Sequence, residues 1–208
     1  NVTADKFLKV ASVSGSGTTG IGQLSFADAS SDFVKLASGT VSSTVSTFSI
    51  DGYFTSDYDN YVIIVNDVTV STSSNNELVM RFNSGGSPIT GSSYTHAFRY
   101  IGNAFGGGAN NGDNSGDNNS SLQLTNDVSS NANSSSHLKI IIHDPLKTDT
   151  YKLTSFDNNT IFQNAGGILR QVGIASYRGS TGAISGATFM VNSGGSYTSA
   201  SWKIYGIK

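Results

Sequence analysis

The sequence predicts an all-β fold, an antiparallel β-sandwich preceded by an extended N-terminal arm. Short runs rich in β-branched and aromatic residues recur at regular intervals from Phe33 onward, a spacing typical of sandwiches and barrels. No segment keeps the apolar period of about 3.6 residues that marks an amphipathic helix. The last eight residues, SWKIYGIK, alternate between apolar and polar positions up to Lys208, which predicts a half-buried strand held in place by a sheet.

The strands are expected wherever such runs occur between turn-forming residues. Their predicted ranges are 33–36, 45–50, 61–70, 77–82, 94–101, 122–124, 138–142, 151–156, 168–177, 183–191 and 201–207.

Four connecting segments have predictions of their own. Residues 53–61 carry cap-type side chains between aromatics and are the one candidate for a short helical turn. Residues 143–145, His-Asp-Pro, are expected to end a strand, and residues 192–195 to form a hairpin turn. Residues 102–121 consist almost wholly of Gly, Asn, Asp and Ser, which predicts a long exposed loop.

Residues 1–32 differ from the rest of the chain. Two short alternating segments flank a Gly/Ser/Thr stretch at residues 14–20, and they hold too few apolar side chains for a core of their own. We therefore expect an arm for attachment or oligomerisation at 1–32 and a sandwich domain at 33–208. The candidate assembly residues of the arm are its apolar ones, Phe7, Leu8, Val10, Ile21, Leu24 and Phe26.

Composition excludes several classes of function. Charged residues make up 12% of the chain, about half the usual share, so Ser, Thr, Asn and Gly must cover the surface. A net charge of −2 without clustered Lys or Arg argues against nucleic acid as a partner. No apolar run approaches the length of a membrane span, so no membrane insertion is expected. The absence of cysteine excludes disulfides and thiolate metal sites.

Catalytic chemistry has little support in the sequence. A hydrolase needs a nucleophile beside a base, or two carboxylates flanking a cleft, and neither arrangement stands out. His96 alternates with Tyr94, Phe98 and Tyr100 on one face of a predicted strand, which suits either a packed histidine or a ligand contact. We therefore expect a protein that is not an enzyme.

The polar segment at residues 111–119 has oxygen-bearing side chains at alternating positions, which are ligands that calcium accepts. It lacks a closing bidentate Glu, and such strings are common in ordinary loops, so no metal or other cofactor is expected and calcium remains the alternative. Exposed aromatic rings beside Asn and Asp are typical of sugar-binding sites. The candidate ligand-binding residues are Tyr94, His96, Tyr100, Phe105, Asn111, Asp113, Asp117 and Asn118.

Segments spread over nearly the whole chain share the strand patterns of one group of domains. They are ADKFLKV at residues 4–10, GQLSF at 22–26, FVKLASGT at 33–40, FTSDYDNYVI at 54–63, LVMRF at 78–82 and WKIYGI at 202–207. On these motifs the chain resembles jelly-roll domains at the ends of tail-fibre and other virion proteins of tailed bacteriophages, notably marine ones.

The resemblance implies a jelly-roll-like antiparallel sandwich in a non-enzymatic virion protein. Such a protein would be made in the host cytoplasm and exposed on the particle surface. Its expected partners are other virion proteins, further copies of itself in a homotrimer, and a host-surface glycan or protein. The first hypothesis is a receptor-binding component of a tail fibre. The alternative is a capsid decoration or head-fibre protein that the N-terminal arm anchors to the capsid.

Overall fold

A computed structural model describes residues 6–14, 21–28, 32–71, 76–103, 108–128, 130, 134–162 and 167–208. Within these ranges the chain is an all-β, antiparallel sandwich without an α-helix, as the sequence predicts. No helix in the described ranges is long and apolar enough to cross a membrane. The chain divides into two compact units, Asn1–Asp32 and Phe33–Lys208.

The first unit contains an antiparallel strand pair, β1 (Lys6–Ser14) and β2 (Ile21–Asp28), with a register shift between Val10 and Ser12. The six candidate assembly residues lie on these two strands, and their side chains fall outside the part of the structure that is described. Their role in anchoring or oligomerisation stays a prediction.

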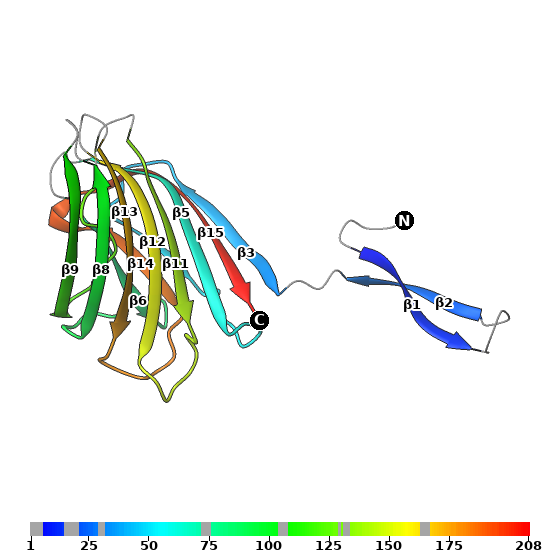
Figure 1. The fold of residues 1–208 in the computed structure, drawn as a ribbon. Helices are drawn as coiled ribbons and strands as arrows, with labels where there is room; N and C mark the ends of the chain where they lie inside the picture. Colours follow the sequence, from blue (N-terminus) through cyan, green and yellow to red (C-terminus); the bar gives the residue numbers. More distant parts are fainter. Residues whose placement is uncertain are drawn as a thin grey trace. The chain divides into compact units, whose positions relative to one another are not determined.

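The second unit consists of two antiparallel sheets (Figure 1). The larger sheet has eight strands in the order β3 (Phe33–Val41), β15 (Tyr197–Ile207), β5 (Asn60–Val70), β11 (Ser136–His143), β12 (Lys152–Phe162), β13 (Gly167–Tyr177), β8 (Tyr94–Asn103) and β9 (Ala109–Asn119). The smaller sheet has the order β10 (Leu122–Gln123), β6 (Leu78–Ser84), β14 (Gly186–Val191) and β4 (Thr47–Asp51), and β7 (Ser87–Pro88) pairs with β6.

The core lies between the two sheets because alternate side chains of each strand point inward. Ile140 and Phe156 of the larger sheet and Met80 and Phe189 of the smaller one are buried in the same cluster. Burying a side chain of this size contributes about 1.5–3 kcal/mol. Such burial holds the two sheets together in a chain without disulfides.

The predicted C-terminal strand is confirmed, and it lies inside the larger sheet rather than at its edge. β15 pairs with β3 on one side and β5 on the other. Its Ile204 is fully buried, and the Trp202 ring covers Gly39 of β3 so closely that a Cβ there would meet the indole at 2.6 Å. The end of the chain therefore completes the sheet.

Two predictions for connecting segments are wrong. Residues 53–61 contain a turn at residues 56–57 and no helix. The Tyr61 hydroxyl holds the segment by donating to the Thr55 carbonyl and accepting from its N–H, at 2.7 Å each. Residues 192–195 are not a hairpin turn, since a 3-10 turn at Asn192–Gly194 leads from β14 in one sheet to β15 in the other. The strand end at His143 is as predicted.

The predicted long loop at residues 102–121 is also wrong over most of its length. β8 continues to Asn103, and β9 pairs with it as the edge strand of the larger sheet. Gly112 and Gly116 occupy inward positions of β9, and the Tyr100 and His96 rings of β8 lie within 3 Å of where their Cβ atoms would stand. Rings lying over glycines in a neighbouring strand stabilise the pair despite its low β propensity.

Candidate functional site

Tyr94 and His96, two of the rings predicted to bind a ligand, point into the core. Tyr94 is fully buried, and its hydroxyl donates to the Ile89 carbonyl at 3.0 Å and accepts from the Phe82 N–H at 3.2 Å. His96 is 5% exposed, and the N–H of Gln123 donates to its Nδ1 at 3.4 Å. Burial raises the pKa of Tyr94 and lowers the pKa of His96.

Of the two roles predicted for His96, a packed histidine or a ligand contact, the structure supports the packed histidine. Tyr100 of the same strand packs partly buried against the core. Phe105 lies outside the described residues, so its predicted role is not assessed by the structure.

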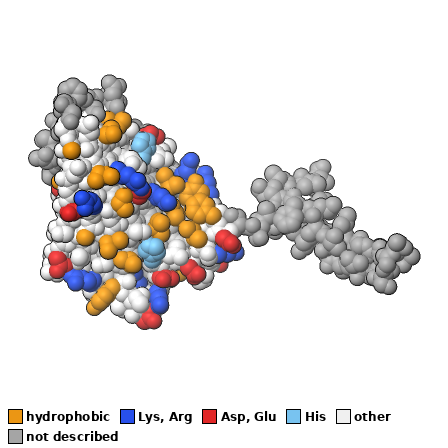
Figure 2. All heavy atoms as spheres, viewed as in Figure 1, with side chains coloured by type: hydrophobic (Ala, Val, Ile, Leu, Met, Phe, Trp, Pro, Cys, Tyr) orange, Lys and Arg blue, Asp and Glu red, His pale blue; other side chains and the backbone are white. Residues whose placement is uncertain are grey.

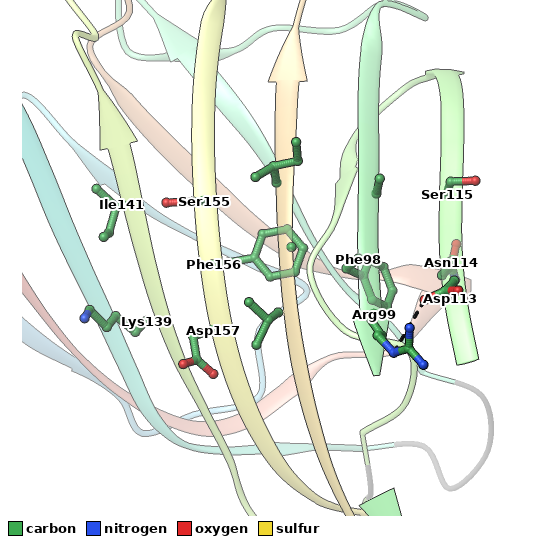
Figure 3. A pocket seen from close by; sticks show the side chains of 14 residues that line it. Phe98, Arg99, Asp113, Asn114, Ser115, Lys139, Ile141, Ser155, Phe156 and Asp157 are labelled. Carbon is green, nitrogen blue, oxygen red and sulfur yellow. Dashed lines mark ion pairs between the residues drawn. The ribbon is translucent and has the colours of Figure 1, made fainter. Parts of the chain in front are cut away.

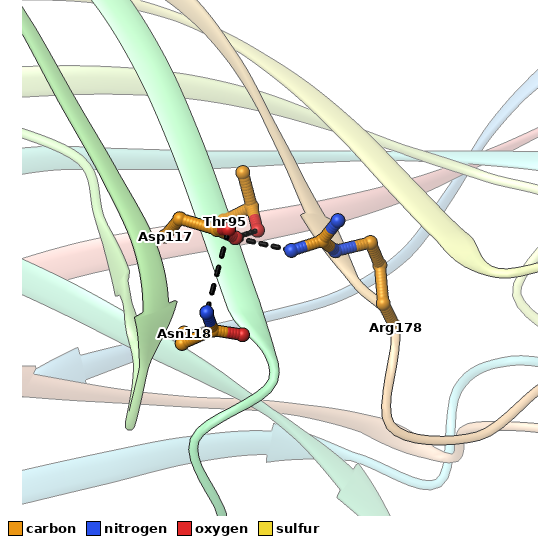
Figure 4. A network of polar contacts seen from close by, with 4 residues as sticks. All are labelled: Thr95, Asp117, Asn118 and Arg178. Atoms are coloured by element: carbon orange, nitrogen blue, oxygen red, sulfur yellow. Dashed lines mark hydrogen bonds and ion pairs between the residues drawn. The ribbon is translucent and has the colours of Figure 1, made fainter.

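Asp117 and Asn118, also predicted to bind a ligand, belong to a polar network at the end of β9 (Figure 4). The Asp117 carboxylate accepts from the Thr95 hydroxyl, from the Arg178 guanidinium and from the Asn118 amide at 3.4 Å. The Thr95 hydrogen bond, with Arg178, holds the pKa of Asp117 below its usual range. These contacts fasten β9 to β8 and to the residue after β13.

The calcium alternative does not suit an extended strand. Side chains two residues apart on one face stand about 6.5–7 Å apart, so the carboxylates of β9 do not converge on one point. Asp113 and Asp117 instead pair with Arg99 and Arg178. In the described ranges no group of three or more His, Asp or Glu side chains is placed to hold a metal ion.

The outer face of the larger sheet exposes an unusual amount of apolar surface (Figure 2). On β13, Ile168, Val172 and Ile174 are 58%, 49% and 58% exposed, and Leu153 of β12 and Ile101 of β8 are exposed as well. Figure 2 shows Lys and Arg side chains among the hydrophobic side chains of this face. Several large apolar side chains exposed on one face of a sheet suit contact with a ligand or partner.

The strand register arranges this face in transverse rows, since cross-strand neighbours on one face stand side by side. One row, here called the charged row, runs Lys203, Ile64, Lys139, Asp157, Val172, Arg99, Asp113. The next, here called the apolar row, runs Tyr205, Val62, Ile141, Ser155, Ile174, Ala97, Ser115.

A hollow of about 610 Å³ lies between these two rows on β11, β12, β13, β8 and β9 (Figure 3). The charged row supplies Lys139 and Arg99 to one wall, and the apolar row supplies Ile141 and Ile174 to the other. Arg99 lies 4.0 Å from Asp113, and both side chains are largely exposed. Lys139 makes no ion pair within the described part of the chain.

A second hollow of about 510 Å³ lies on the same face, lined by Ile101, Ile161 and Ile168 together with Asn111 and Arg170. An ion pair separates the two hollows: the Arg170 guanidinium donates to both carboxylate oxygens of Asp157, at 3.1 and 2.7 Å. That hydrogen bonding raises the pKa of Arg170.

Asn111 and Asp113 are the predicted ligand residues that the structure brings to this face. Asn111 lines the second hollow and Asp113 the first. The other predicted residues with described side chains lie in the core or in the polar network of Asp117.

A serine, a histidine and an asparagine also meet on this face. The His143 ring has Ser155 Oγ 3.2 Å from Nε2 and Asn60 Oδ1 3.2 Å from Nδ1, a spacing similar to that of a nucleophile, base and orienting group. Ser155 stands in mid-strand, where the ladders on both sides occupy the backbone N–H groups that an oxyanion would need. The contact is therefore a cross-strand polar link, and His137 repeats it with Asn66 and Ser135.

Sequence reasoning missed most residues that line the hollows, although a signal was present. β13 carries apolar residues on both of its faces: Ile168 and Val172 point outward, and Leu169 points inward. A strand with one solvated face should alternate between apolar and polar residues. The departure in β13 marks a second face that is suited to a partner.

Comparison with models of protein families found no matching family, and searches of curated proteins and of solved structures found no match. The geometry of the larger sheet is therefore the basis for assigning a function.

Proposed function

We propose that this chain is a non-enzymatic structural protein of a bacteriophage virion whose sandwich attaches the particle to the host surface. The attachment site is the outer face of the larger sheet. The observation that carries the proposal is the hollow between the charged row and the apolar row, because it combines exposed aliphatic surface with hydrogen-bonding and charged groups. Sites for external ligands have this composition.

The site lies on the rigid sheet instead of on the loop that the sequence suggests at residues 102–121. β9 contributes Asp113 and Ser115 to one end of the hollow. An open hollow of this kind makes many weak contacts and few strong ones. Several copies in a homotrimer would then supply the avidity that one site lacks.

The test is binding of the labelled full chain to cells of the phage host, with competition against phage adsorption. Ile174→Ser removes an aliphatic side chain from the hollow and should weaken cell binding by about tenfold, since a buried Ile side chain contributes about 1.5–3 kcal/mol. Tyr151→Ser is the matched control, because Tyr151 is equally exposed, at 58%, and does not line the hollow. A chain that neither binds host cells nor slows adsorption would refute the attachment role.

A capsid decoration or head-fibre role is the second candidate. It is favoured by the division of the chain into Asn1–Asp32 and Phe33–Lys208, because a separate N-terminal unit suits an anchor. Immunogold labelling of purified particles distinguishes the two. Label at the tail tip supports attachment to the host, whereas many copies over the head support decoration.

A further inference from the structure

We infer that the ligand of the hollow between the charged and apolar rows is an acidic linear polysaccharide lying across the strands, with its acid groups on Lys139 and Arg99. This inference rests on the proposed attachment function and names the chemical class of the receptor. It follows from the balance of charges on this face, from their ion-pairing and from the composition of the two walls.

The charged row and the adjacent Arg170 carry more cations than anions. Lys203, Lys139, Arg99 and Arg170 face two carboxylates, those of Asp157 and Asp113. The whole chain has a net charge of −2, so this band is locally opposite in sign to the molecule. Such a band attracts an anionic partner and repels a second copy of itself placed face to face.

The cations differ in how far they are already paired. Arg170 is held by two hydrogen bonds to Asp157. Arg99 has only a 4.0 Å contact with an exposed carboxylate, and Lys139 has no ion pair in the described ranges. Lys139 and Arg99 are therefore the two groups on this wall that remain available to a ligand's acid groups.

The separation of the strands that carry these two cations favours a polymer over a single sugar acid. They share one row but lie on β11 and β8, which are three strand intervals apart, or roughly 14 Å. A ligand that reaches both must be extended and carry acid groups at intervals along its length.

The opposite wall suits a saccharide better than a nucleic acid. Ile141, Ile174 and Ala97 offer aliphatic contact to sugar C–H groups, and Ser155 and Ser115 offer hydroxyls. The aromatic rings beneath the hollow, Phe98 and Phe156, are buried, so no ring is exposed there to stack on a base.

The experiment measures binding of the full chain to polygalacturonate, heparin, dextran and poly(dT) at 50 and 200 mM salt, concentrations over which a polyanion interaction weakens. Polygalacturonate or heparin should bind and dextran and poly(dT) should not. Lys139→Gln and Arg99→Gln should each weaken binding by about tenfold, because each removes the cation that would form a charge-assisted hydrogen bond to an acid group of the ligand. Asp113→Asn, which removes the carboxylate beside Arg99, should tighten it.

Lys147→Gln is the matched control, because it removes an equal charge from a lysine that does not line either hollow. Its binding should equal that of the unmodified chain.

Equal binding of dextran, tighter binding of poly(dT), or unchanged binding by Lys139→Gln and Arg99→Gln would each overturn the inference. If host cells bind the chain in an Ile174-dependent way but no acidic polymer does, the attachment role stands and the acidic ligand is wrong. If acidic polymer binds but host cells do not, the attachment role fails.

Discussion

At the scale of single residues, His96 illustrates how position decides the role of a polar side chain. Its ring lies in the sandwich beside Phe98, at a centroid distance of 6.0 Å, and above Gly116 of β9. Desolvation by burial lowers its pKa, while the hydrogen bond with Asn114 and the charge of Glu77 act in the opposite direction. A neutral imidazole therefore belongs to the folded state.

This lowered pKa makes stability depend on pH. The unfolded chain, with an ordinary histidine pKa of about 6.5, binds the proton more readily than the folded chain. The stabilisation is thus fully present above about pH 6.5 and is lost as the pH falls through the folded-state value. Urea unfolding at pH 7.5 and 5.5 should show a smaller loss for His96→Leu than for the unmodified chain. An equal loss would mean that His96 does not couple protonation to folding.

Gly173 is a second residue whose identity is fixed by its neighbours. A Cβ at this position would stand 2.3 Å from Phe98 Cβ and 2.6 Å from the Ala97 carbonyl oxygen, so β13 and β8 would have to separate. Gly173→Ala should lower the free energy of unfolding by about 1–3 kcal/mol, the usual cost of overpacking. Gly108→Ala, with no atom within 4 Å, is the control and should change it little. Similar unfolding midpoints for both variants would contradict this packing.

At the scale of elements, β9 shows where sequence patterns fail. Strand prediction depends on apolar alternation, and this strand has none, because its inward positions are occupied by Asn and Gly, and the two glycines lie beneath rings supplied by β8. The strands that are rich in β-branched residues, such as β5 and β13, agree with their predicted ranges to within one residue at each end. The residues that favour pairing of β9 are Tyr100 and His96, and they lie on the neighbouring strand β8.

The fit of β9 beneath these rings can be tested at Gly116. A Cβ there would meet the buried His96 ring at 2.8 Å, so Gly116→Val should release β9 from β8. Hydrogen exchange should then speed up in Ala109–Asn119 while β5 and β11 stay protected. Ser115→Val, on the outward side of the same strand, should leave the exchange unchanged, and equal effects of the two variants would refute this account.

β15 is the element on which the larger sheet depends most. Deleting residues 202–208 would remove most of the strand that pairs with both β3 and β5 and would open the core around Ile204. We expect an aggregating or unfolded product, because the exposed strand edges are ready to pair with other chains. Circular dichroism and light scattering measure this. Removal of Lys208 alone, which lies beyond the strand, should change neither signal.

At the scale of the whole molecule, the chain separates into a small N-terminal unit and a sandwich with its own core. All described core residues lie between Val41 and Ile204. Residues 33–208 expressed alone should therefore melt at the same temperature as the full chain. A lower melting temperature would contradict the independence of the sandwich. Light scattering on the same sample tests the arm, because a monomer obtained from a trimeric full chain would assign oligomerisation to residues 1–32.

The sequence by itself determined the fold class, most strand positions and the structural character of the C-terminus, because these depend on local alternation and on which residues avoid water. Tertiary structure alone decided that Tyr94 and His96 point inward, that residues 109–119 form a strand, and that Lys139 and Arg99 share a row. The physical reason is that register and sheet order join residues far apart in the chain. The residues that surround a given position in the sequence specify neither its register nor the order of the strands in the sheet.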